Sequence, residues 1–384
     1  MPTVLFTAST YSHIANFHRP YLRAFHELGW QVHVACGGEP RPIPEADLSV
    51  LLPFEKKMAS PANFKAQSLL RQLMKRHRYA LICTHTSLAA FFTRRAAAGL
   101  RPRPLLVNMA HGYLFDDATM PLKKAILLAA ERVTAPQTDL VLTMNRWDYE
   151  TAVRCRLGRR VEIIPGVGVD FSRLDGPSPA DADDLRNRLG FTKSDFLLIY
   201  AAEFSARKNQ AMLIRALPRL PEQVRLLLPG QGALLEDCKA LAQSLGISHR
   251  VVFPGQVTEM PLWYAAADAA VSASRSEGLP FNVMEAMYRG LPVAVSQVKG
   301  HTDLVTHGLN GLLYPYGDEA AFVRRIQHLT EHPGEARAMG EAARASIAPY
   351  ALKAVLPQVM EQYLSLVPET AAHSGVQKPA SKSP

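Results

Sequence analysis

The sequence predicts an α/β protein made of two doubly wound domains that face each other across a cleft. Short apolar runs rich in Val, Ile and Leu recur along the chain, and helix-like segments separate them. This alternation is typical of parallel sheets covered by helices on both faces. A connector rich in Pro, Asp and Gly, from Gly166 to Gly190, divides the runs into two series. Ligands of such sheets bind at the carboxyl ends of the strands.

Each series contains six predicted strands. The first comprises Val4–Ser9, Val32–Gly38, Ala80–Thr86, Leu105–Ala110, Asp139–Met144 and Val161–Pro165. The second comprises Phe196–Ala202, Arg225–Gly230, Val251–Gly255, Ala269–Ser274, Leu291–Ser296 and Gly311–Tyr314. We therefore expect an N-terminal domain over 1–168, a linker over 169–190, a C-terminal domain over 191–348, a helix over 349–367 and a disordered tail over 368–384.

The composition is that of a cytoplasmic protein. At 384 residues the chain can bury two substantial cores. Its four cysteines are scattered and show no metal-ligand spacing, which indicates reduced thiols. The N-terminus reads as a first strand and not as a signal peptide. No apolar stretch approaches the ~20 residues that span a bilayer.

The excess of positive over negative charge lies in the first half of the chain. The net charge of +9 belongs wholly to residues 1–170, and the remainder is neutral. This asymmetry predicts that the N-terminal domain meets an anionic membrane surface, although a solvated basic face is the plainer alternative. Nucleic acid is not expected, because no basic motif is interleaved with aromatic residues. The candidate membrane contacts are Arg71, Lys75, Arg76, Arg94, Arg95, Lys123 and Lys124.

The stretch from Ser276 to Glu285 predicts an anion site at the start of a helix. It follows a buried strand, and Pro280 suits the first helical turn, where no backbone N–H is required. The N–H groups of that turn attract anions. Glu285 would lie roughly 6–8 Å along the helix axis from its start. This spacing fits a pyrophosphate at the helix tip and a ribose bound by Glu285, whereas the plainer alternative is a loop and helix with two surface glutamates.

These residues resemble the signature of the retaining glycosyltransferases of family 4, which have two Rossmann-like domains (the GT-B fold). The resemblance covers residues 3 to about 330. It implies that Glu277 contacts the donor sugar and Glu285 the ribose, with Gly278, Leu279 and Phe281 at the helix start. It also implies that the final helix crosses back to the N-terminal domain. Gln256 and Val257 fall where this family has its uracil-binding loop.

The phosphate ligand predicted for the second domain is Lys208. The family pattern is Gly-Arg-x-x-x-x-Lys, but here Ala202 replaces the Gly and Glu203 replaces the Arg. Arg207 is a second candidate cation, although on a helix its position would point away from Lys208. The Glu203 variant is similar to a subgroup that makes bacterial capsule, exopolysaccharide and lipid-linked or protein-linked glycans.

Candidate cleft residues of the first domain follow its strands. The loop from Ser9 to His18 lacks Gly-x-Gly-x-x-Gly, which argues against a nicotinamide oxidoreductase. His111 ends a strand, so its side chain should project into the cleft, and in the resembled family a His here lies beside the donor sugar. The residues expected to face the acceptor or the cleft are Ser12, His13, Asn16 and Asn145.

The resemblance implies transfer of a hexose or N-acetylhexosamine, with retention, from a nucleotide-sugar, expected to be a UDP-sugar. The expected acceptor is a glycan on a polyprenyl diphosphate, used at the cytoplasmic face of the inner membrane for surface polysaccharide. The expected catalytic residues are Glu277, His111 and Lys208. No metal or other cofactor is expected, because fixed cations would stabilise the leaving pyrophosphate.

A possible metal motif and three alternative functions were compared with this prediction. Asp181 and Asp183 superficially match the Asp-x-Asp metal motif of the other major glycosyltransferase fold, but they follow no strand. A nucleotide-sugar epimerase of the same fold and a non-catalytic nucleotide-sugar-binding protein remain as alternatives. A retaining phosphorylase would need a much larger chain.

Overall fold

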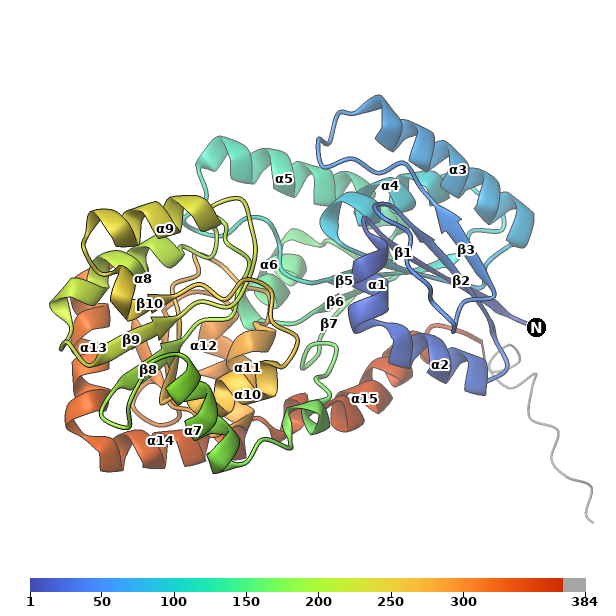
Figure 1. Cartoon of the computed structure of the whole chain (residues 1–384). Helices are drawn as coiled ribbons and strands as arrows, with labels where there is room; N and C mark the ends of the chain where they lie inside the picture. Colours follow the sequence, from blue (N-terminus) through green and yellow to red (C-terminus); the bar gives the residue numbers. More distant parts are fainter. Residues whose placement is uncertain (369–384) are drawn as a thin grey trace, which may run out of the picture. The chain divides into compact units, whose positions relative to one another are not determined.

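The computed structural model describes residues 1–368. They form two compact units, each with its own parallel sheet (Figure 1). Unit 1 consists of Met1–Val167 with the described residues from Val355 onward, and unit 2 is Gly168–Ala354. The predicted fold class, two parallel α/β domains, is confirmed.

Unit 1 contains a seven-stranded sheet in the order β3-β2-β1-β4-β5-β6-β7. Its strands are β1 (Thr3–Ala8), β2 (Gln31–Cys36), β3 (Leu48–Leu51), β4 (Leu81–His85), β5 (Leu105–Ala110), β6 (Leu140–Thr143) and β7 (Arg160–Ile163). Strand β1 is buried along its whole length, which explains why its sequence is mostly apolar. Sequence reasoning missed β3, a short edge strand in which every second residue is exposed. The winding direction reverses between β1 and β4, and open α/β sheets bind ligands at such a switch point.

Helices cover the sheet of unit 1 (Figure 1). They are α1 (Tyr11–Phe17), α2 (Arg19–Glu27), α3 (Pro61–His77), α4 (Ser87–Ala97), α5 (Pro121–Thr134), η1 (Ala135–Gln137) and α6 (Arg146–Cys155). The hydroxyl of Ser60 accepts from the N–H of Ala62 and so caps α3, whose first residue is a proline. Fully buried Arg94 of α4 pairs with Glu131 of α5 at 2.7 Å, which ties these two helices together.

Unit 2 contains a six-stranded sheet in the order β10-β9-β8-β11-β12-β13. Its strands are β8 (Phe196–Ile199), β9 (Val224–Leu227), β10 (Val251–Val252), β11 (Ala269–Ser272), β12 (Val293–Ser296) and β13 (Leu312–Tyr314). The core on this sheet includes the fully buried rings of Tyr200, Phe204 and Tyr314. The switch point of unit 2 lies between β8 and β11.

The stretch over 169–190, expected to be a linker, folds as part of unit 2. It contains η2 (Phe171–Leu174) and α7 (Pro179–Arg188). Ser178 and Asp181 cap α7 reciprocally, and Asp183 pairs with Lys193 at 2.9 Å. The two aspartates therefore have structural partners at the start of α7 and at the surface of unit 2.

The other helices of unit 2 follow its strands in chain order. They are α8 (Gln210–Ala216), η3 (Leu217–Arg219), α9 (Leu235–Ser244), η4 (Ser248–Arg250), α10 (Met260–Ala266), α11 (Phe281–Tyr288), α12 (His301–Leu304), α13 (Glu319–Glu331), α14 (Pro333–Ser346) and η5 (Ala348–Tyr350).

Helix α15 (Leu352–Leu364) leads the chain from unit 2 into unit 1. Its buried Tyr363 packs edge-on against Phe6 of β1, with 6.2 Å between ring centroids. The predicted disordered tail, beyond residue 368, lies outside the described residues. Within residues 1–368, no helix has both the length and the apolar character needed to cross a membrane.

Candidate functional site

The predicted donor residues of unit 2 gather at the carboxyl ends of β8 and β11, the strands that flank its switch point. Arg207 and Lys208 follow β8, and Glu277 follows β11. Neighbouring parallel strands end at the same edge of a sheet, so residues far apart in the sequence meet here.

Two cations hold Glu277. Lys208 Nζ lies 2.5 Å from Oε1 of Glu277, and Nη1 of Arg207 lies 2.9 Å from Oε2. The same Nη1 also donates to the backbone carbonyl of Ser276 at 3.2 Å. The expectation that Arg207 would point away from Lys208 is wrong, because both residues lie in the turn before α8 and not on a helix.

The charges of this group can be assigned. Burial alone would raise the pKa of Glu277, but Lys208 and Arg207 outweigh burial and hold it at about 2. Burial lowers the pKa of Lys208, and Glu277 opposes this effect. Glu277 is therefore ionised at neutral pH, and the site places a carboxylate beside two cationic side chains.

A glycine allows a second loop to pack directly on Glu277. Gly300 has a φ of +82°, and a Cβ there would lie 2.8 Å from the Cβ of Glu277. The next residue, His301, is fully buried, and its Nδ1 lies 2.8 Å from the carbonyl oxygen of Ser296. Burial lowers the pKa of His301 to about 4. Sequence reasoning missed His301, although it closely follows a strand, the signal that identified His111.

Helix α11 begins at Phe281 with Pro280 as its N-cap, close to the predicted start. The predicted donor residues Gly278 and Leu279 lie just before it, and Leu279 is buried. Glu285 follows about one turn into the helix, as expected, and is only 8% exposed.

Arg173 and Tyr264 contact the carboxylate of Glu285. The hydroxyl of Tyr264 donates to Oε2 at 3.0 Å, and Arg173 of η2 forms an ion pair with Oε1. Burial raises the pKa of Glu285, and Arg173 and Tyr264 oppose this rise. Arg173 was not predicted, because it lies in the expected linker and no local motif marks it. Its side chain is 57% exposed but that of Glu285 is only 11% exposed, so a ligand that displaces Arg173 must itself pair with the buried carboxylate.

A cavity of about 620 Å³ lies beside Glu285 within unit 2. Small-molecule sites commonly measure about 300–1,000 Å³. The cavity wall includes Thr258 and Glu259, and the predicted residues Gln256 and Val257 directly precede them in the chain. The cavity thus connects the carboxylate predicted to bind ribose with the neighbourhood of the loop predicted to bind a nucleobase.

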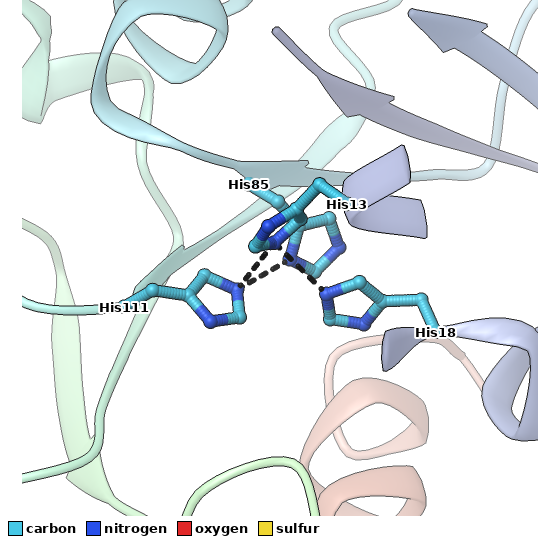
Figure 2. A group of neighbouring side chains, drawn as sticks. All are labelled: His13, His18, His85 and His111. Atoms are coloured by element: carbon cyan, nitrogen blue, oxygen red, sulfur yellow. Dashed lines mark hydrogen bonds between the residues drawn. The ribbon is translucent and has the colours of Figure 1, made fainter. Parts of the chain in front are cut away.

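Four histidine rings meet in unit 1 at the carboxyl ends of β1, β4 and β5 (Figure 2). His13 belongs to α1, His18 lies between α1 and α2, His85 ends β4, and His111 follows β5. Nε2 of His13 lies 3.2 Å from Nε2 of His111 and 3.3 Å from Nε2 of His18. Nδ1 of His85 lies 3.2 Å from Nε2 of His111. The structure thus brings together two predicted cleft residues, His13 and His111.

Burial makes all four rings neutral at pH 7. It lowers the pKa of His13 to about 4 and brings the pKa values of the other three well below the ordinary value. Sequence reasoning missed His85, although it ends a strand, as His111 does. No fixed spacing links the four residues, because they come from separate elements.

The remaining cleft predictions have different outcomes. The hydroxyl of Ser12 donates to that of Thr10 at 3.1 Å, and Asn16 is exposed on α1. Asn145 requires a correction. Its side chain is fully buried and caps α6 by accepting from the N–H of Asp148 at 2.8 Å. Asp148 in turn accepts from the N–H of Tyr113 at 3.1 Å, so Asn145 supports the loop after His111 and is not exposed to a ligand.

Comparison with known proteins gives consistent matches. The family model for Glycosyltransferase Family 4 matches residues 21–173, and that for Glycosyl transferases group 1 matches residues 181–346. A Bacillus subtilis protein named as a glycosyltransferase, EpsD, is 34% identical over 347 residues, which are 89% of this chain and 91% of that protein. The Escherichia coli enzyme UDP-Gal:alpha-D-GlcNAc-diphosphoundecaprenol alpha-1,3-galactosyltransferase is 25% identical over 70% of this chain and 71% of its own.

Solved structures share the fold over nearly the whole chain. Anabaena HepE in complex with UDP and glucose has a TM-score of 0.78 at 21% identity and covers 95% of this chain and 100% of its own. WaaG, a glycosyltransferase involved in lipopolysaccharide biosynthesis, has a TM-score of 0.74 at 18% identity and covers 94% and 99%. Together with the family matches and the site at the two strand ends, these likenesses establish that the chain belongs to glycosyltransferase family 4, with the GT-B fold.

Proposed function

We propose that this glycosyltransferase moves a hexose or N-acetylhexosamine from a UDP-sugar to a glycan carried on a polyprenyl diphosphate. The observation that carries the proposal is the group formed by Glu277, which precedes α11, and by Lys208 and Arg207, which precede α8. Such a group offers both an acceptor for sugar hydroxyls and fixed charge for a diphosphate. The UDP bound by HepE and the diphosphoundecaprenol acceptor named for the Escherichia coli relative support the choice of substrates.

In the proposed reaction, the bond between the anomeric carbon and the phosphate oxygen of the donor breaks. Positive charge grows on the sugar ring, and negative charge grows on the departing UDP. Lys208 and Arg207, with the N-terminus of α11, stabilise the leaving group. The acceptor hydroxyl bonds to the anomeric carbon and loses its proton to the departing phosphate. Family membership supports retention of configuration, and the part expected of His111 beside the sugar stays a prediction.

Donor binding must break ion pairs that the donor-site side chains form with one another in this structure. Lys208 and Arg207 both contact Glu277, and Arg173 contacts Glu285. We propose that the pyrophosphate takes a share of the two cations while Glu277 turns to the sugar hydroxyls. We propose likewise that the ribose displaces Arg173 from Glu285. The fixed cations take the part that a metal ion plays at the diphosphate in other enzymes, so no metal is needed at this site.

The test is incubation with UDP- and GDP-sugars and a polyprenyl-diphosphate-linked acceptor, read by mass spectrometry. The proposal requires a product heavier than the acceptor by one hexosyl or N-acetylhexosaminyl residue. Lys208→Ala should abolish most of this product, whereas Lys193→Ala, at a pair on the surface of unit 2, should not. Free epimerised sugar without acceptor product would instead identify an epimerase, and donor binding without either product would identify a binding protein.

The surface of α5 supports a peripheral position at the membrane, which we propose to be its cytoplasmic face. Leu122, Ile126 and Val133 are 74%, 62% and 63% exposed. Their spacing of four and seven residues places them in one stripe along the helix. Exposed Lys123 and Arg132 flank the stripe, one on each side. An apolar stripe bordered by cations is the pattern of helices that lie in the interface of anionic membranes.

One predicted membrane contact is wrong, and a second is partly exposed and held by structural hydrogen bonds. Arg94 is fully buried against Glu131. Arg71 donates to the backbone carbonyls of Ala96 and Ala98 at the end of α4. Lys75, Arg76, Arg95 and Lys123 are exposed. The membrane proposal therefore rests on α5 more than on the count of basic residues.

Sedimentation with liposomes tests this surface. Binding should require anionic lipid and weaken as salt screens the charges. Ile126→Ser should reduce binding, whereas Leu309→Ser should not, because Leu309 is equally exposed at 62% but lies in unit 2. Protein that stays in the supernatant with anionic liposomes at low salt would contradict the membrane proposal and leave the transfer reaction untouched.

A further inference from the structure

The four-histidine cluster of unit 1 contains more close contacts than hydrogen bonding explains (Figure 2). A nitrogen of a neutral imidazole either carries one N–H or offers one lone pair. Nε2 of His13 has two imidazole partners, at 3.2 and 3.3 Å, and Nε2 of His111 also has two, both at 3.2 Å. The three contacts join the nitrogens in the order His18, His13, His111, His85. Since each nitrogen can take part in only one ordinary hydrogen bond, at most two of the three contacts can be hydrogen bonds.

The same distances match the edges of a tetrahedron around one ion. Zinc lies about 2.0–2.1 Å from a histidine nitrogen. Two ligands of a regular tetrahedron are then roughly 3.3–3.4 Å apart, by geometry from that bond length. The contacts of 3.2, 3.3 and 3.2 Å come close to this value. One nitrogen of each of the four rings lies within 4.8 Å of the others, so the remaining edges must shorten by up to about 1.4 Å to complete the shell.

The donor set also selects the kind of ion. Four imidazole nitrogens suit zinc and neighbouring transition metals, whereas Mg²⁺ and Ca²⁺ prefer oxygen ligands. Among the described residues, this is the one group of side chains whose ligand atoms converge in this way.

We propose that Nε2 of His13, His18 and His111 and Nδ1 of His85 bind one divalent transition-metal ion, with Zn²⁺ the best fit. The ion would join the segments after β1, β4 and β5 at the switch point of unit 1. His18 and His85 are fully buried and His13 and His111 are partly exposed, so the ion enters from the side of the latter pair. The proposal depends on unit 1 alone and does not rest on the proposed transfer reaction.

The outer contacts of the cluster set its affinity. Histidine ligands of tightly bound metals usually donate their second N–H to a carboxylate, a carbonyl or water. Within residues 1–368, Nδ1 of His18 and Nε2 of His85 are buried and have no hydrogen-bond partner. We therefore expect an ion that a chelator removes from the folded protein, and not one that is needed for folding.

The test uses the full chain, purified without a histidine tag and dialysed against a chelator. Co²⁺ titration should produce the intense visible absorption of tetrahedral cobalt at one ion per chain, and one equivalent of Zn²⁺ should bleach it. His85→Gln should weaken Zn²⁺ binding by more than about 100-fold, since even changes to outer contacts cost 10–100-fold. The matched control is His33→Gln, because His33 is also buried in unit 1 and hydrogen-bonds Tyr79 away from the cluster.

His85 is buried, so His13→Gln, at the partly exposed edge, provides a second variant that is easier to tolerate. Circular dichroism shows whether each variant is folded. Tetrahedral Co²⁺ in the wild type and in His33→Gln, with loss in either cluster variant that folds, supports the site. No binding, octahedral cobalt, or unchanged binding in a folded cluster variant overturns it, whatever the result of the glycosyl-transfer assay.

Discussion

Lys208→Met should separate the catalytic role of the donor site from its structural role. The substitution keeps much of the side-chain volume and removes the charge that lies 2.5 Å from Glu277. Groups placed to stabilise a developing oxyanion contribute about 2.7–4 kcal/mol, or 100–1,000-fold in turnover. Arg207 remains 2.9 Å from Glu277, so we expect turnover to fall roughly 100-fold, at the lower end of that range.

Donor binding should change less than turnover. The charge on the diphosphate grows as the glycosidic bond breaks, and an interaction that strengthens in the transition state acts mainly on kcat. Stability should also fall, because removing one partner of a buried pair costs up to about 3–5 kcal/mol. Arg207 compensates part of that cost by neutralising Glu277. Thermal unfolding therefore has to accompany the kinetic measurement.

The assay measures kcat and KM for the donor, together with UDP affinity by calorimetry. Lys193→Met is the matched control, because Lys193 pairs with Asp183 at the surface and is 84% exposed. If folded Lys208→Met retains wild-type turnover, the lysine does not stabilise the leaving group. If UDP affinity falls and the KM for the donor rises while kcat is unchanged, Lys208 binds the ground state and the transition state equally.

Three further predictions concern the same unit. The folded-state pKa of Glu277 is depressed to about 2, so the stability that Glu277 contributes is present above its ordinary pKa near 4.5 and is lost as the pH falls toward 2. Lys208→Met should reduce this dependence of the free energy of unfolding on pH. A dependence as steep as that of the wild type would contradict the charge assignment. Glu285→Gln should weaken UDP binding, measured by calorimetry, by about 1–3 kcal/mol. Replacing UDP with dUDP, which lacks a ribose hydroxyl, should reduce affinity less in this variant than in the wild type. An equal reduction in both proteins would argue against ribose binding by Glu285. Mg²⁺ or Mn²⁺ added after EDTA treatment should leave turnover unchanged, and activation by either ion would revive an ion at the diphosphate; recovery with Zn²⁺ alone would point to the histidine cluster.

The strands could be predicted from the sequence because burial on both faces leaves a strong local signal. Strand β1 is buried throughout, and its sequence is apolar apart from two threonines. Edge strand β3 escaped prediction because only every second residue is partly buried and the strand is four residues long. The helix start near Pro280 was predictable for a similar reason, since proline and the preceding strand restrict the local backbone.

Contacts that join distant segments could not be predicted in this way. Arg173 reaches Glu285 from a stretch that looks like a linker, and its partner is 112 residues away. Asn145 misled the prediction because a polar residue after a strand can either face a ligand or cap the next helix. Only the buried bond to Asp148 distinguishes these roles. The convergence of Arg207 on Glu277 was also missed, because a helix was assumed where the chain makes a turn.

The two units place chemically different groups at equivalent positions. In both, the side chains follow the strands on either side of the switch point, β1 and β4 in unit 1 and β8 and β11 in unit 2. In unit 2 the result is a carboxylate held by two cations, which suits a sugar diphosphate. In unit 1 the group consists of four imidazole rings without a carboxylate, and burial lowers the pKa of each ring. Four converging imidazole nitrogens match the metal ion proposed above and not a sugar diphosphate, so the common fold provides the position and the side chains decide the ligand.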